Sequence, residues 1–176
     1  MLPTLKTWSP REKVTSALMN QQIRDVHKWL ENPPYFECKR SEAYTLTGGA
    51  TAVLPWNSES SNGFTFTKDA SNRVTSVSPK YRGRYMLHMQ LCGKVSAPTC
   101  HLYVDFLVNG AVRQIGVIDF ESASFMDSVR ITALLRLEAG DVLSTRVYAS
   151  SGRTATLTSS ADQQLATVFY GYWMGA

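Results

Sequence analysis

Histidine and cysteine are the side chains of this sequence that could bind a transition metal, and the chain has three of each: His27, His88, His101, Cys38, Cys92 and Cys100. A structural zinc site needs four such ligands at short, regular spacings. No CxxC pair occurs, and the histidines fall on one predicted helix and two predicted strands. In a simple hairpin register His88 would face Val104 rather than His101. We therefore expect no metal site.

The cysteines allow one other kind of chemistry, a disulfide bond. Cys92 and Cys100 flank a loop, residues 93–99, between two predicted strands. If these strands form a simple hairpin, the two thiols lie opposite each other and within reach of a disulfide. The alternative is that both are small buried residues in a reducing cytoplasm. The sequence favours the alternative and leaves the disulfide open.

Acidic side chains could support glycoside hydrolysis, which needs two carboxylates about 5–10 Å apart in a cleft. Asp119 and Glu121 form the closest pair in the strand region, and Asp141 is better explained by the turn at residues 139–141. The sequence contains no GxSxG, HExxH, Walker A or GxGxxG motif. We therefore expect no enzyme, with no catalytic residue and no cofactor.

The charge and hydropathy of the chain limit its partners. The formal net charge is +4, and the basic residues are scattered singly along the sequence. Nucleic-acid-binding proteins usually gather such charge into a patch or a run, so we expect no nucleic acid partner. No apolar run reaches the roughly 18 residues that a membrane span needs. The N-terminus also lacks the apolar region of a signal peptide, so export is not indicated.

The first element that would position these side chains is a helix. Ser9 to Glu12 has the composition of a capping box with proline at the first helical position, and Thr15 offers a second start. Pro33 and Pro34 end the helix, because residues before proline leave the helical region. At helical spacing one face of this helix is apolar and carries Leu18, Met19, Ile23, Val26, Trp29 and Leu30. This apolar face must be covered by the rest of its own domain, by copies of itself or by another protein.

After Pro34 the hydrophobic period changes to two, which is typical of strands. Residues 41–82 indicate short strands and long loops, and the alternation becomes clear from residue 84 onward. Asn109-Gly110 predicts a tight hairpin turn. About eight strands predict a mainly β fold, an antiparallel jelly-roll sandwich preceded by one N-terminal amphipathic helix. We divide the chain into a helical segment, residues 1–40, and a jelly roll, residues 41–176.

The last predicted strand is apolar or aromatic on both faces, whereas a strand of a monomeric sandwich usually has one wet face. Phe169 and Trp173 share one face, and Tyr170, Tyr172 and Met174 share the other. One face would fill the core, and the other would be buried against another subunit. Loops from residues 41–82 are the alternative cover.

Residues 42–176 resemble the tumour-necrosis-factor-like jelly roll, in the version shared with complement globular heads. The resemblance is carried by short elements in the same order: Gly83, Tyr85, Asn109, Gly110, Leu135, Leu137, Gly140, Asp141 and the aromatic strand from Phe169 to Trp173. Arg84 departs from the pattern, since an aliphatic residue often stands between the glycine and the tyrosine. The resemblance implies a homotrimer, because this family assembles as threefold trimers.

The segment before the jelly roll is similar to the N-terminal segment of small virion proteins of tailed bacteriophages, especially those that infect actinobacteria. Arg11 stands where that pattern usually has glycine. The matching residues are Trp8, Glu12, Val14, Thr15, Ala17, Asn20, Ile23, Arg24, Asp25, Leu30, Pro33 and Pro34. The resemblance implies a virion structural protein, assembled in the host cytoplasm, whose partners are other proteins of the tail or capsid.

We therefore expect a non-enzymatic, homotrimeric minor tail or baseplate component that is attached through its N-terminal helix. One alternative is a capsid decoration or head fibre protein at threefold positions. The other is a carbohydrate-binding or hydrolysing receptor-binding protein, which would contact a host cell-surface glycan through aromatics such as Trp56 and Tyr81. The expected virion anchor comprises Trp8, Leu18, Ile23, Val26, Trp29 and Leu30. The expected trimer interface comprises Tyr85, Phe169, Tyr170 and Tyr172.

Overall fold

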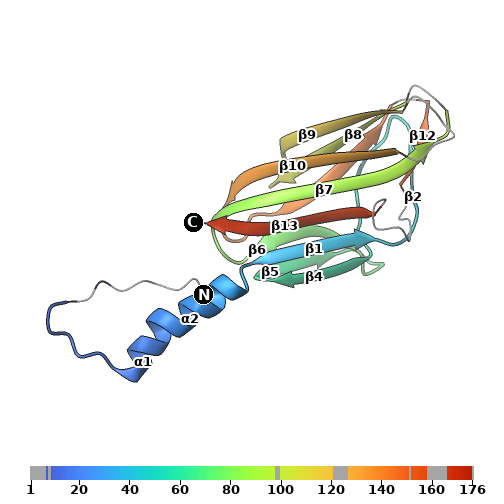
Figure 1. Cartoon of the computed structure of the whole chain (residues 1–176). Coiled ribbons are helices and arrows are strands. Elements are labelled where there is room, and N and C mark those ends of the chain that lie inside the picture. Colours follow the sequence, from blue (N-terminus) through green and yellow to red (C-terminus); the bar gives the residue numbers. More distant parts are fainter. Residues whose placement is uncertain are drawn as a thin grey trace.

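The computed structural model describes residues 7, 9–97, 100–120, 127–150, 152–157 and 166–175, and it shows a helical segment at one end of a β-sandwich (Figure 1). The helical segment comprises α1 (Ser16–Met19), a wider π-helical turn η1 (Asn20–Arg24) and α2 (Asp25–Glu31). The strands of the described residues are β1 (Tyr35–Arg40), β2 (Tyr44–Thr47), β3 (Thr51–Val53), β4 (Ser58–Asn62), β5 (Phe64–Lys68), β6 (Val74–Pro79), β7 (Gly83–Val95), β8 (Cys100–Val108), β9 (Ala111–Phe120), β10 (Asp127–Leu137), β11 (Leu143–Ala149), β12 (Thr154–Leu157) and β13 (Thr167–Gly175).

The first sheet is built around β7, the longest strand. Along one side β7 pairs with β10, and along the other it pairs first with β13 and then, from Gly93 to Val95, with β12. β13 pairs in turn with β1, and β1 pairs with β4, while β12 pairs with β2. All of these pairings are antiparallel. The first and last strands of the sandwich, β1 and β13, are therefore neighbours in the middle of one sheet.

The second sheet has the order β5-β6-β11-β8-β9, with β3 pairing on β11. Its pairings are also antiparallel. Together the two sheets confirm the predicted fold class, a mainly β antiparallel sandwich behind a helical segment.

The core lies between the two sheets, because alternate residues of each strand point inward. An aromatic cluster forms its centre. The ring of Phe169 lies 4.8 Å from that of Phe36, 5.8 Å from that of Trp56 and 5.5 Å from that of Phe106. Each of these side chains is at most 2% exposed. Aromatic packing across the two sheets therefore holds β1 and β13 onto the second sheet.

Two adjacent turns are locked by polar side chains. Asn109 and Gly110 both have positive φ, 52° and 78°, and they form the predicted hairpin turn between β8 and β9. Asp141 accepts from the Glu138 backbone N–H at 2.8 Å and from the Asn109 side-chain amide at 2.8 Å. The expectation that a turn explains Asp141 is therefore confirmed.

The predicted hairpin between residues 84–92 and 100–108 is wrong, since β7 and β8 belong to different sheets. Cys92 and Cys100 consequently do not face each other across a ladder, and all three cysteines are free and buried. The strand count is also higher than predicted. β1 to β6 all fall between residues 35 and 79, where short polar strands alternate weakly and resemble loops. The helical segment ends before Tyr35 rather than at residue 40, because β1 is an integral strand of the first sheet.

Candidate interaction surfaces

The helical segment projects from one end of the sandwich (Figure 1). Of the two starts that the sequence offers, the structure uses Thr15, whose side chain accepts a hydrogen bond from the Leu18 backbone N–H at 3.2 Å. Ser9 and Glu12 form a separate turn, in which the Glu12 carboxylate accepts from the Ser9 N–H at 3.1 Å. The helix therefore begins at Ser16, and its cap satisfies one of the backbone donors that every helix leaves unpaired.

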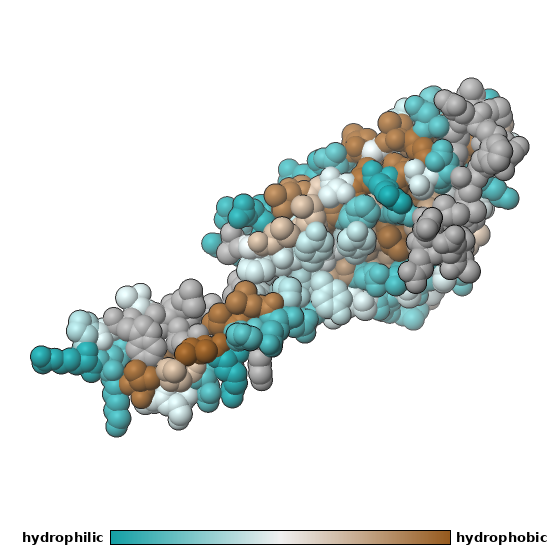
Figure 2. Space-filling view, in the orientation of Figure 1, coloured by the Kyte–Doolittle hydropathy of each residue, from teal (hydrophilic) through white to brown (hydrophobic). Residues whose placement is uncertain are grey.

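Most of the predicted anchor residues form an apolar stripe along this helix, comprising Leu18, Ile23, Val26 and Leu30. Ile23 is 56% exposed and Leu30 is 64% exposed, while Leu18 and Val26 are half-buried. In the π turn the backbone closes over five residues, which brings Leu18 and Ile23 to the same side. Figure 2 shows hydrophobic surface along the projecting segment, away from the sandwich. The stripe thus exposes Ile23 and Leu30 to solvent.

Trp29, unlike the other described residues of the predicted anchor, packs against aromatic side chains of the sandwich. Its ring meets that of Tyr81 at 4.8 Å and that of Trp173 at 5.7 Å, both nearly edge-on. We call these three residues the junction. Gly83 makes room for it, because a Cβ at that position would lie 2.3 Å from the indole Nε1 of Trp173. Trp29 therefore holds the helix on its own domain and is taken out of the surface available to a partner.

Hydrogen bonds beside the junction fix the chain where it passes from helix to sandwich. The backbone N–H of Trp173 donates to the Pro34 carbonyl at 2.9 Å, and the Asn62 side-chain amide donates to the Asn32 carbonyl at 2.8 Å. The C-terminal end of the helix is thus fastened to the sandwich. Trp8, the remaining predicted anchor residue, lies outside the described residues.

The outer face of the first sheet carries exposed aromatic side chains on adjacent strands. Tyr35 of β1 pairs directly with Tyr172 of β13, and they are 40% and 41% exposed. Tyr170 lies on the same face, and the three tyrosines border a shallow pocket of about 300 Å³. We call Tyr35, Tyr170 and Tyr172 the tyrosine face. Met174, 50% exposed, extends this apolar surface toward the end of β13.

His88 of β7 supports the tyrosine face from the next strand. Its ring lies 4.8 Å from that of Tyr170, with the two planes inclined by 31°. The His88 Nδ1 is hydrogen-bonded to the Thr132 hydroxyl at 2.9 Å. Burial, with a smaller contribution from the Arg130 charge, lowers the pKa of His88 from its ordinary value and so favours the neutral imidazole.

Comparison with known proteins shows the same architecture. No family model matches the sequence, and no curated protein is similar to it. Among solved structures, murine APRIL at pH 5.0 is similar with a TM-score of 0.57 and 12% identity over 81% of this chain and 99% of that chain. Eiger TNF from S. frugiperda is similar with a TM-score of 0.50 and 15% identity, over 82% of this chain and 95% of that chain. The fold is a tumour-necrosis-factor-like jelly roll.

Two residues of the predicted trimer interface lie inside this jelly roll. Tyr85 is fully buried, and its hydroxyl donates to the Tyr81 carbonyl at 2.8 Å. Phe169 is the centre of the aromatic core cluster. Neither side chain can reach a second copy, so this part of the prediction is wrong. Tyr170 and Tyr172 remain, because they lie on the opposite face of β13 from Phe169.

Tyr35 and His88 belong to the same surface, although neither was predicted to lie there. Tyr35 was assigned to the helical segment, although the alternation of Tyr35, Glu37 and Lys39 with buried residues already had the period of a strand. His88 became a neighbour of Tyr170 only through the pairing of β7 with β13. No local pattern in the sequence could have indicated that pairing.

The histidines considered for metal binding are dispersed, since His27 lies on α2 and His88 and His101 lie on strands of different sheets. No group of three His, Cys, Asp or Glu side chains in the described part of the chain could hold a metal ion. Trp56 and Tyr81, the suggested sugar-stacking aromatics, are taken up by the core and the junction. Within the described residues no helix has the length and apolar character of a membrane span.

Proposed function

We propose that this chain is a non-enzymatic structural protein of a bacteriophage virion, a homotrimeric minor tail or baseplate component that is attached to the particle through its helix. The observation that carries the proposal is the apolar stripe on a helix that projects from its own domain, with Ile23 and Leu30 each more than half exposed. The similarity of residues 8–34 to phage virion proteins is the reason for proposing that the particle is a phage virion.

The energy available from the stripe is sufficient for attachment. Burial of a large aliphatic side chain contributes about 1.5–3 kcal/mol, and Ile23 and Leu30 are each more than half exposed before any partner is bound. In a trimer three such helices act together, which raises the effective affinity without a new contact. A weak docking site on the particle would therefore hold the trimer.

The tyrosine face supports the trimer. Tyr35 and Tyr172 expose aromatic surface in the middle of a sheet rather than at its edge, and Met174 extends it. Contiguous exposed apolar surface usually marks an interface. Threefold assembly is also what the resemblance to tumour-necrosis-factor-like jelly rolls implies. Burial of this face in the trimer would leave the helices free at one end of the assembly.

The test uses phage particles assembled with a variant protein. Leu30→Asp places a charge on the stripe, and we expect the purified variant to remain a folded trimer that is missing from particles. Leu30 does not belong to the junction, so the fold should be unaffected. If particles incorporate the variant as efficiently as they incorporate the original protein, the anchor lies elsewhere. Gold labelling of the original protein then locates it at the tail or, for the decoration alternative, on the head.

A further inference from the structure

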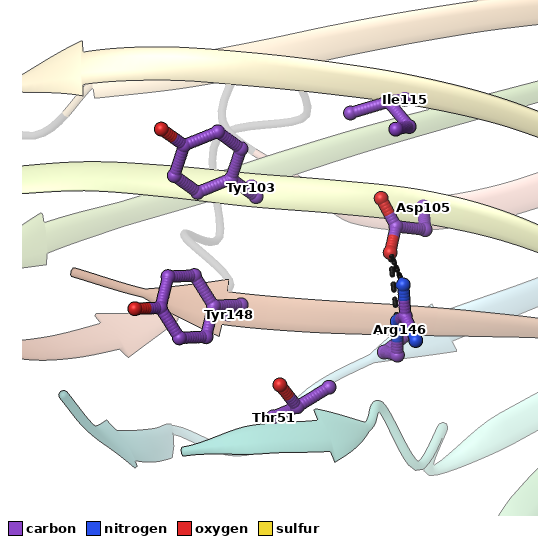
Figure 3. Close-up of a pocket in the computed structure, with 6 residues that line it drawn as sticks. All are labelled: Thr51, Tyr103, Asp105, Ile115, Arg146 and Tyr148. Carbon is purple, nitrogen blue, oxygen red and sulfur yellow. Dashed lines mark hydrogen bonds and ion pairs between the residues drawn. The ribbon is translucent and has the colours of Figure 1, made fainter. Parts of the chain in front are cut away.

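A second pocket lies on the outer face of the other sheet. Its volume is about 370 Å³. Four adjacent strands contribute to it, in the order β9, β8, β11 and β3. Figure 3 shows the lining side chains, all from one chain: Thr51, Tyr103, Asp105, Ile115, Arg146 and Tyr148. We call it the Tyr103 pocket.

Cross-strand pairing arranges the lining side chains in two rows. Tyr103 pairs directly with Tyr148, and Asp105 pairs directly with Arg146. Directly paired residues point to the same face of a sheet, so an aromatic row lies beside an ionic row. Ile115, which pairs with Asp105 from β9, is 57% exposed and forms a rim. The pocket thus presents an apolar wall and a polar wall to the same ligand.

The ion pair gives the polar wall a fixed geometry. The Arg146 Nε donates to the Asp105 Oδ2 at 2.7 Å, and Nη2 contacts the same oxygen. Only 7% of Asp105 is exposed. Because both contacts use Oδ2, the other carboxylate oxygen, Oδ1, accepts no hydrogen bond from the described residues. This oxygen is therefore available to a ligand hydroxyl, and a hydrogen bond accepted by a carboxylate is stronger than one between neutral groups.

The two tyrosines form the apolar wall. Their ring centroids are 5.7 Å apart and their planes are inclined by 50°, so neither ring covers the other. Tyr103 is 39% exposed although its strand lies between β9 and β11. Aromatic rings with open faces and a polar tip are suited to ligands that are apolar on one side and hydroxylated at the edge.

These features together select one class of ligand. A wholly apolar ligand would leave Asp105 Oδ1 without a donor, and an anionic ligand would meet a carboxylate that already neutralises Arg146. A pyranose ring offers a C–H face to the tyrosines. Its adjacent hydroxyls can donate to Asp105 and accept from Arg146. We propose that the Tyr103 pocket binds a neutral pyranose sugar, either as a mono- or disaccharide or at the end of a glycan.

The size and place of the pocket agree with this ligand. Its volume is near the lower end of the usual range of about 300–1,000 Å³ for small-molecule sites, as expected for one or two sugar rings. The pocket and the tyrosine face lie on different sheets. Self-association through the tyrosine face therefore does not use the residues that line the pocket. The inference goes beyond the proposed function and does not depend on it.

The test is saturation-transfer difference NMR on the full chain, with glucose, galactose, mannose, rhamnose and N-acetylglucosamine as separate probes. We expect at least one of these sugars to bind, and Tyr103→Ala to weaken that binding by about tenfold or more, which equals the loss of about 1.4 kcal/mol. Tyr35→Ala is the matched control, because Tyr35 is 40% exposed and lies on the other sheet. It should leave sugar binding unchanged even if it alters the oligomeric state.

A second variant guards against misfolding of Tyr103→Ala. Ile115→Arg removes little buried packing, since Ile115 is 57% exposed on an edge strand, and the long arginine side chain should block the pocket. Binding of none of the five sugars overturns the proposal. It is also overturned if Ile115→Arg still binds sugar fully, if Tyr35→Ala and Tyr103→Ala lose binding equally, or if N-acetylneuraminic acid, which is anionic, binds more tightly than every neutral sugar.

Discussion

The indole of Trp29 meets the indole of Trp173 nearly at right angles, with ring centroids 5.7 Å apart and planes inclined by 86°. One residue belongs to the last turns of the helix and the other to the last strand of the jelly roll. Edge-to-face pairs of this kind are favourable beyond the area that they bury. The direction in which the helix leaves the sandwich is therefore set by aromatic packing at its base.

Replacement of Trp29 tests this role of the junction. We expect Trp29→Ala to speed amide hydrogen exchange throughout α2 and to lower the free energy of unfolding by about 1–2 kcal/mol, since Tyr81 and Trp173 lose their cover. Leu30→Ala on the same helix is the control, and its effect should stay within about 0.5 kcal/mol because the side chain is already exposed. Equal exchange rates in both variants would mean that the junction does not hold the helix.

A charge on the tyrosine face should prevent trimer formation. Tyr172→Arg would place three guanidinium groups in the buried part of the proposed interface, where unpaired charges are strongly unfavourable. Sedimentation velocity should then show monomer at concentrations where the original protein is a trimer. Tyr103→Arg, at a position of similar exposure on the other sheet, should sediment like the original protein. A trimeric Tyr172→Arg protein would place the interface elsewhere.

Gly116 lies where β9, an edge strand of the second sheet, meets β10, an edge strand of the first. A Cβ at this position of β9 would be 2.0 Å from the Ile131 Cγ2 of β10. We expect Gly116→Ala to lower the free energy of unfolding in urea by about 1–3 kcal/mol through overpacking. Ile131→Ala combined with Gly116→Ala should cost less than the sum of the two single changes. Strict additivity would show that the two positions do not compete for the same space.

Alkaline pH should destabilise the jelly roll through Cys38. Burial, with the charges of Glu59 and Glu37, raises the pKa of this thiol to about 12 from an ordinary value of 9.0. Because the folded pKa is the higher one, this contribution to stability is complete below pH 9 and is lost as the pH rises toward 12. Urea unfolding across this range should show the loss.

Cys38→Ala provides the control for the alkaline experiment. It should weaken the pH dependence of unfolding without removing it, because burial also raises the pKa of Tyr85 to about 12. The contribution of Tyr85 to the stability of the fold is therefore also lost as the pH rises. An unchanged pH dependence in Cys38→Ala would show that the thiol does not contribute.

Local features of the fold were predictable from the sequence. The Asn109-Gly110 turn follows from backbone conformations that few residue pairs adopt, and Asp141 follows from the composition of its own turn. Alternation separated the two faces of β13 correctly. It could not say which face meets the core and which is left exposed, so the prediction placed Phe169 at an interface although it lies in the core.

Features that depend on distant pairings were not predictable. Asp105 and Arg146 are 41 residues apart, and Trp29 meets partners at the middle and the end of the chain. The most misleading assumption was that consecutive strands pair. β7 and β8 follow each other in sequence, but they belong to opposite sheets, so the positions inferred for Cys92, Cys100 and His88 from a hairpin were wrong.

The place of β13 between β1 and β7 has a consequence for biosynthesis. Until Thr167 to Gly175 have left the ribosome, β1 has no partner on its β7 side, and the nascent chain exposes two unpaired strand edges. Such edges invite pairing with other chains, and contacts between residues so far apart in sequence form slowly. The first sheet can therefore be completed only after its last strand is synthesised, and until then the exposed edges make the growing chain prone to aggregation.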